Sequence, residues 1–216
     1  MASSLIHVAI ASEVNKRIKR NESALLIGSL APSLYKQVGG RKQITHFIDE
    51  QFGDIPNIKL FLDKYKPYLK DDFVLGYYLH LYTDYLWNKY FLPEIYTHNL
   101  ITTLNDKVVR CNKEEMKRYI YSDYTNLNTK IIEMYDINLN VFYNDPPHFR
   151  KIIEEIPMDR IHLIAKETSV IIENSKKKKQ YLFDAGNIKQ FIDTSVLLIL
   201  SKLEELGIRW KRIEIH

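Results

Sequence analysis

The sequence is short of cysteine, glycine and proline. Its 216 residues include a single cysteine, Cys111, which excludes a disulfide framework and any zinc finger built on cysteine ligands. Any metal site must therefore use histidine and carboxylate side chains. The seven glycines and seven prolines are about half the share of turn formers in an average chain. This shortage argues against a β-sandwich or a Rossmann-type fold and favours long helices joined by few loops.

Long apolar runs and a strong charge imbalance are also missing. The cleanest apolar run near the C-terminus, Val196 to Leu200, is far shorter than the roughly 20 residues that cross a bilayer. The first residues do not have the pattern of a signal peptide, so we expect a cytoplasmic location and no integral membrane segment. A formal net charge of +4 is too small to indicate nucleic-acid binding, although it would favour the approach of an anionic substrate.

What the sequence does contain is helical periodicity along most of its length. Hydrophobic residues make up 45% of the chain, enough for a sizeable core, and the length suits one domain, 1–216. The spacing of apolar residues predicts an all-α fold with helices at about 4–20, 21–31, 56–65, 71–91, 93–110, 113–135, 159–176 and 187–205. We expect an irregular segment at 34–55, a loop at 142–148, and a solvated lysine linker at 176–179 (with an anionic membrane contact as the less favoured alternative).

The most informative motif lies on the most apolar of these helices, 71–91. His80 and Asp84 are four residues apart, so both side chains project from one helix face. A carboxylate on a buried helix needs a compensating charge. A divalent cation would provide it, and so would an arginine or lysine from another helix. Because many helices contain such a pair by chance, the pair alone is a weak motif.

Two further histidines strengthen the metal interpretation. His7 belongs to the inward-facing stripe of the first helix, and His46 lies in the irregular segment, between Thr45 and Phe47. Considered alone, His7 is most simply a core histidine that is hydrogen-bonded to a backbone carbonyl. Considered alone, His46 is most simply a surface residue in a loop. Taken together with His80 and Asp84, they form a ligand set that suits zinc, manganese or iron when cysteine is absent.

Four segments in this order resemble a known family: Met1 to His7, Leu26 to Pro32, Lys42 with Thr45–His46–Phe47, and Leu75 to Trp87. The chain is similar here to the zinc-dependent phospholipase C family, and in particular to its bacterial cytosolic branch. The resemblance covers about residues 1–90 and continues more weakly through 121–124, at Asn128 and at 191–193. It implies an all-helical phospholipase C-like fold that binds up to three zinc ions in a cleft and cleaves phosphodiester bonds, including those of phospholipid head groups.

The resemblance also assigns ligands. His46, His80 and Asp84 match the first zinc site, and His7 with Asp84 matches the site that also uses the free N-terminus. Ser33 departs from the pattern, because the family has an aspartate ligand there, and no His…His-x-x-x-Glu set follows Asp84. We therefore expect one zinc ion, with manganese or iron as alternatives. A second ion would need help from one of three acids, Asp49, Asp123 and Asp193.

These observations predict a metal-dependent hydrolase in which a metal-bound hydroxide cleaves a phosphodiester or a phosphate ester. Its substrate would be a small phosphodiester or a phospholipid-like molecule, and Lys42 is a candidate phosphate contact. Ser33 motivates the alternative of a degenerate family member that binds a ligand or a partner with little or no catalysis. A third hypothesis, an HD-type phosphohydrolase, needs an adjacent His-Asp pair, which the sequence lacks.

Overall fold

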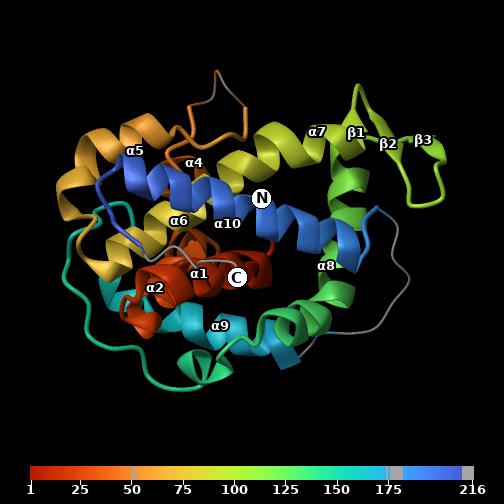
Figure 1. The fold of residues 1–216 in the computed structure, drawn as a ribbon. Coiled ribbons are helices and arrows are strands. Elements are labelled where there is room, and N and C mark those ends of the chain that lie inside the picture. Colours follow the sequence, from red (N-terminus) through yellow and green to blue (C-terminus); the bar gives the residue numbers. More distant parts are fainter. Residues whose placement is uncertain (50, 52, 174, 176–181, 211–216) are drawn as a thin grey trace, which may run out of the picture.

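The protein is predominantly helical, with a small antiparallel sheet at one corner (Figure 1). The computed structural model describes residues 1–49, 51, 53–173, 175 and 182–210. The predicted all-α class is therefore confirmed, while the predicted lysine linker at 176–179 lies outside the described residues. The α-helices are α1 (Ser4–Ile18), α2 (Glu22–Gly28), α3 (Tyr35–Val38), α4 (Lys42–Thr45), α5 (Ile58–Tyr65), α6 (Asp72–Leu86), α7 (Leu92–Ile95), α8 (Lys113–Tyr135), α9 (His162–Glu173) and α10 (Ala185–Glu205).

Most helices begin where a capping side chain precedes an apolar stripe. Ser3 accepts a hydrogen bond from the backbone N–H of Ile6 at the start of α1. Asn112 and Glu115 form a capping box at the start of α8, whose bounds are those predicted from the sequence. The helix predicted from Pro56 instead begins at Ile58, because Asn57 supplies the cap.

The predicted helix at 93–110 is wrong. The single helical turn α7 is followed by a three-stranded antiparallel sheet, β1 (Tyr96–Thr97), β2 (Leu100–Thr102) and β3 (Val108–Arg110), in the order β1-β2-β3. His98 and Asn99, which join β1 to β2, both have positive φ, as a type I′ hairpin turn requires. The β-branched residues of this segment favour strands, and the aliphatic spacing alone did not separate the two possibilities.

Helix α6 occupies the centre of the core, and its two broad sides pack against different helices. It lies against α1 and α2 on one side and against α5 and α10 on the other (Figure 1). Gly28 of α2 and Gly76 of α6 allow this packing, since a Cβ atom at Gly76 would overlap the carbonyl oxygen of Leu25, and one at Gly28 that of Phe73. The two backbones are therefore in direct contact, without an intervening layer of side chains.

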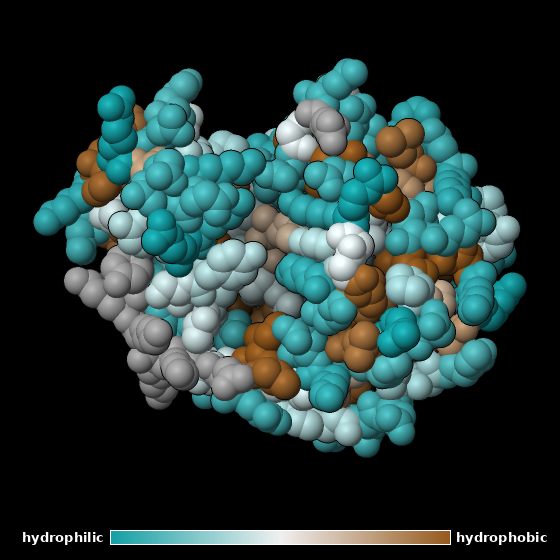
Figure 2. Space-filling view, turned by 180° about the vertical axis from the view of Figure 1, so that it is seen from behind, coloured by the Kyte–Doolittle hydropathy of each residue, from teal (hydrophilic) through white to brown (hydrophobic). Residues whose placement is uncertain are grey.

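One face of the molecular surface carries mainly polar side chains (Figure 2). Seen from behind, it is mostly hydrophilic, with hydrophobic residues in separate patches (Figure 2). Within the described part of the chain, no helix has both the length and the apolar character needed to cross a membrane.

Candidate metal site

Three separate segments bring the four predicted ligands together at the centre of the molecule. His7 comes from α1, His46 directly follows the short helix α4, and His80 and Asp84 lie one turn apart on α6. Their exposed fractions are 3%, 0%, 1% and 0%, respectively. We call these four residues the metal cluster.

Asp84 is the common partner of the three histidines. Its Oδ1 atom accepts a hydrogen bond from the backbone N–H of Ala2 at 2.9 Å and lies 3.3 Å from Nε2 of His7. Its Oδ2 atom lies 3.5 Å from Nε2 of His80 and 3.7 Å from Nε2 of His46, yet makes no hydrogen bond. A buried carboxylate oxygen without a hydrogen bond is rare and needs an explanation.

The tautomers of two histidines follow from their outer partners. Nδ1 of His80 lies 2.7 Å from the carbonyl oxygen of Ser29, which can only accept, so this nitrogen carries the proton. Nδ1 of His46 lies 2.8 Å from Oγ1 of Thr45, whose own proton is donated to the carbonyl of Lys42. In their neutral forms, both rings therefore present a bare Nε2 lone pair to the interior of the cluster.

In these tautomers, no donor lies between the two lone pairs. Nε2 of His46 and Nε2 of His80 lie 3.2 Å apart, and Oδ2 of Asp84, a third acceptor, is close to both. In addition, neither ring nitrogen of His7 makes a hydrogen bond, although its ring stacks on that of His80 with centroids 3.7 Å apart. Such a set of facing acceptors is stabilised by a cation at its centre.

The electrostatic environment favours the protonation states that metal binding needs. Burial, reinforced by the neighbouring His80, lowers the pKa of His7 to about 4 and that of His46 well below its usual value. Burial opposes a charge on Asp84, but His7 and His80 hold the pKa of its carboxyl well below the ordinary range. At neutral pH His7 and His46 are thus neutral imidazoles and Asp84 is a charged carboxylate.

Three members of the cluster are especially well placed to share one ion. Ligand atoms of His7, His80 and Asp84 all lie within 4.8 Å of one another, and His46 approaches the same carboxylate oxygen as His80. The outer partners Ser29 and Thr45 were not predicted as functional residues. Thr45 is adjacent to His46 in the sequence, a signal that could have found it, whereas Ser29 acts through its backbone, which the sequence does not mark.

The three acids predicted as helpers for a second ion have other partners. Asp123 accepts a hydrogen bond from the backbone N–H of Leu182 at 2.8 Å and thereby fixes the chain before α10. Asp193 accepts one from the hydroxyl of Tyr135 at 2.9 Å. Asp49 accepts one from the backbone two residues ahead, at 3.1 Å. None of the three belongs to the metal cluster.

Lys42 and Ser33 lie outside the cluster as well. Nζ of Lys42 lies 3.1 Å from Oδ1 of Asp54, whose other oxygen pairs with Lys113 at 2.8 Å. Ser33 is half-buried in the 3₁₀ turn Ala31–Leu34 and lines a small cavity of about 40 Å³. Phosphate contact by Lys42 stays a prediction, and it would require this lysine to leave Asp54.

Comparisons of the chain with protein-family models, with curated proteins and with solved structures found no match.

Proposed function

We propose that the protein is a metal-dependent hydrolase with one zinc ion at the metal cluster, acting on a phosphodiester or a phosphate ester. The observation that carries this proposal is the convergence of two imidazole lone pairs, on His46 and His80, with the unpaired Oδ2 atom of Asp84. Imidazole and carboxylate are ligands that zinc shares with manganese and iron. A zinc ion with only three protein ligands would supply a coordinated water of pKa about 7 and polarise a phosphoryl oxygen.

The residues around the cluster would prepare it for this role. The carbonyl of Ser29 and the hydroxyl of Thr45 fix the ring orientation and tautomer of His80 and His46, as outer partners do in metal sites generally. The backbone N–H of Ala2 holds Asp84 so that its other carboxylate oxygen faces the two Nε2 atoms.

Burial of the cluster favours a second candidate, in which the zinc ion is structural. None of five surface cavities formed by the described residues is lined by His7, His46, His80 or Asp84. If all four side chains ligate, the tetrahedral shell is complete and no position is left for water. The ion would then join α1, α4 and α6, and the protein would bind a ligand or a partner with little or no catalysis.

Metal analysis combined with a hydrolysis assay separates these candidates. Both candidates predict that the protein binds one zinc ion per chain and that Asp84→Asn loses it. Asp193→Asn is the control variant and should keep the metal. If the protein is a hydrolase, it should cleave bis(4-nitrophenyl) phosphate only when zinc is bound. The visible spectrum of the cobalt-substituted protein should also change when acetohydroxamate is added, because the ion has a position open to an added ligand. A zinc-loaded protein that shows neither would contradict the hydrolase and support the structural role. A protein that binds no metal would contradict both.

A further inference from the structure

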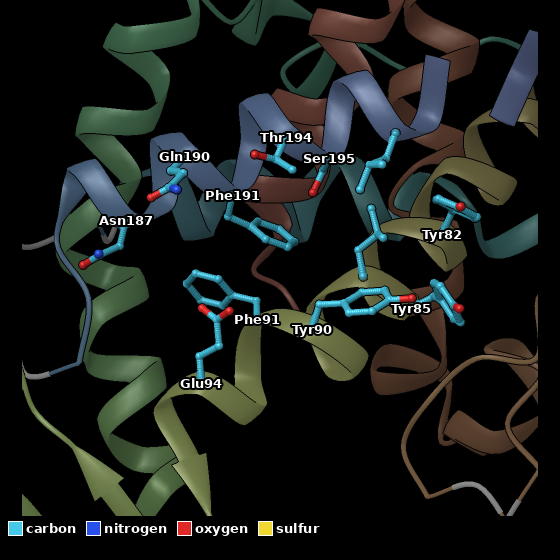
Figure 3. A pocket seen from close by; sticks show the side chains of 12 residues that line it. Tyr82, Tyr85, Tyr90, Phe91, Glu94, Asn187, Gln190, Phe191, Thr194 and Ser195 are labelled. Carbon is cyan, nitrogen blue, oxygen red and sulfur yellow. The ribbon is translucent and has the colours of Figure 1, made fainter. Parts of the chain in front are cut away.

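A second cavity lies on the side of α6 that faces away from the metal cluster. Its volume is about 510 Å³, within the usual range for small-molecule sites. It is formed between the C-terminal half of α6, the π turn Trp87–Phe91 and α10 (Figure 3). No member of the metal cluster lines it. We call it the aromatic cavity.

Aromatic rings form the floor and one end of this cavity. Phe91 and Phe191 contact each other with ring centroids 5.0 Å apart, and Tyr90 extends away from this pair towards Tyr85 (Figure 3). Tyr90 and Phe91 both belong to the π turn, and both line the cavity. Single π turns inside α-helices are frequent at functional sites. Exposed aromatic faces in a cavity favour a planar ligand that stacks on them.

Polar groups gather at the opposite end. Glu94 rises from α7 towards the rings, and Asn187 and Gln190 line the same end from α10 (Figure 3). No hydrogen bond or ion pair of the Glu94 carboxylate occurs among the described residues. A carboxylate only accepts hydrogen bonds, so it matches a ligand edge with two adjacent N–H donors. Among nucleobases, guanine presents such an edge, at N1 and N2.

A cationic cavity adjoins the aromatic one. The two share Tyr82 and Tyr85, and the second has a volume of about 700 Å³ and is lined by four lysines, Lys59, Lys66, Lys89 and Lys202, and by one acid, Asp63. Nζ of Lys89 lies over the rings of Tyr85 and Tyr90, 4.9 and 5.3 Å from their centroids. It donates to the hydroxyl of Tyr85 at 2.6 Å and has no carboxylate partner within the described part of the chain. Lys59 is paired with Asp63 at 2.5 Å, and Lys202 is paired with Glu205 at 2.6 Å. The charge excess therefore lies at Lys66 and Lys89, and it favours an anionic group next to the stacked ring.

From these observations we infer that the two cavities together form a binding site for a guanine mononucleotide. The base stacks on Tyr90 and Phe91 with its donor edge towards Glu94, and the phosphate lies beside Lys89. This site is independent of the metal cluster, because a different face of α6 builds it. It gives the protein a nucleotide ligand that the proposed hydrolysis neither requires nor explains.

Calorimetric titration of the EDTA-treated protein with GMP, AMP and guanosine tests the inference. We expect GMP to bind more tightly than AMP, and Glu94→Gln to remove that difference. Tyr90→Ala should weaken both nucleotides roughly tenfold, the scale of one base–aromatic stack. Tyr90 is 53% exposed, so this change does not disrupt the core. Lys89→Ala should weaken GMP and leave guanosine unchanged. Lys117→Ala, on the distant surface of α8, is the matched control.

Three outcomes would overturn the inference. The first is the absence of GMP binding up to about 1 mM, the weak end of specific affinity. The second is GMP binding that none of the three variants alters. The third is binding of laurate with no binding of GMP, which would identify the cavities as a site for an anionic acyl chain. Since zinc is absent from this titration, its result does not depend on whether the metal cluster hydrolyses phosphate esters.

Discussion

Nε2 of His46 and Nε2 of His80 face each other at 3.2 Å, and the outer hydrogen bonds of both rings leave these two nitrogens without protons. Two lone pairs at this distance repel unless a cation or a shared proton lies between them. Burial lowers the pKa of His46 well below its usual value, so a shared proton is unfavourable at neutral pH. The repulsion is the physical reason for expecting a metal ion.

Zinc should therefore stabilise the folded protein. A ligand that binds only the native state, at a free concentration a hundred times its Kd, adds about 2.7 kcal/mol to the free energy of unfolding. For a chain of this size that is roughly a 5–10 °C rise in Tm. Differential scanning calorimetry with zinc and with EDTA measures the shift. An unchanged Tm, with zinc shown to be present, would contradict binding at the buried cluster.

Replacing the outer partner of His46 should weaken the metal without unfolding the protein. Thr45→Val removes the hydroxyl that accepts from Nδ1 of His46 and leaves a side chain of similar shape. Loss of such a partner typically lowers metal affinity about 10–100-fold. Competition with a zinc-binding dye measures this affinity. Thr125→Val, which removes a hydroxyl bond within α8, is the control and should leave the affinity unchanged.

The metal-free protein should lose stability as the pH falls from about 6.5 to 4. The pKa of His7 is about 4 in the folded state, against 6.5 as its ordinary value. In this interval the unfolded chain binds the proton more readily, so acid favours unfolding by about 3 kcal/mol. Urea denaturation at several pH values in EDTA measures the loss. His7→Phe should reduce this dependence and leave the share that comes from His46, and the same change at the exposed His98 should not reduce it.

The contact between α2 and α6 should tolerate no side chain at either glycine. In Gly76→Ala the new methyl group would overlap the carbonyl oxygen of Leu25, so the two helices must separate. Overpacking of this kind costs about 1–3 kcal/mol. Ser201→Ala, on the exposed side of α10, should change the free energy of unfolding by less than about 0.5 kcal/mol. Equal urea midpoints for the two variants would be inconsistent with direct backbone contact.

The sequence predicted which four side chains meet in the core better than it predicted the secondary structure around 93–110. His80 and Asp84 share a helix, so their spacing alone placed them on one face, and the inward stripe of α1 placed His7 in the core. His46 lies in a segment without helical periodicity, so its grouping with them rested on its ligand chemistry and on the resemblance of its segment to a known motif. The hairpin at His98 and Asn99 was missed, because positive φ at two non-glycine residues has no clear signature in the sequence.

Other parts of the two sites could not have been predicted from the sequence. The partner of His80 is a backbone carbonyl, that of Ser29, and any residue type could supply one. The aromatic cavity is lined in part by the π turn, where five residues, Trp87–Phe91, depart from the winding that helical periodicity assumes. Helical periodicity therefore predicted the face of α6 on which Asp84 lies, but it could not predict where the side chain of Tyr90 lies.

The close contact of α2 and α6 at Gly28 and Gly76 also determines which nitrogen of His80 carries a proton. Gly28 is followed by Ser29, and Gly76 lies one turn before His80, so the approach of the two backbones sets the distance from the Ser29 carbonyl to Nδ1 of His80. That distance keeps the proton of the imidazole on the outer nitrogen and leaves the inner one free. The absence of a side chain at Gly28 and Gly76 thus determines which nitrogen of the buried His80 ring is available to a metal ion.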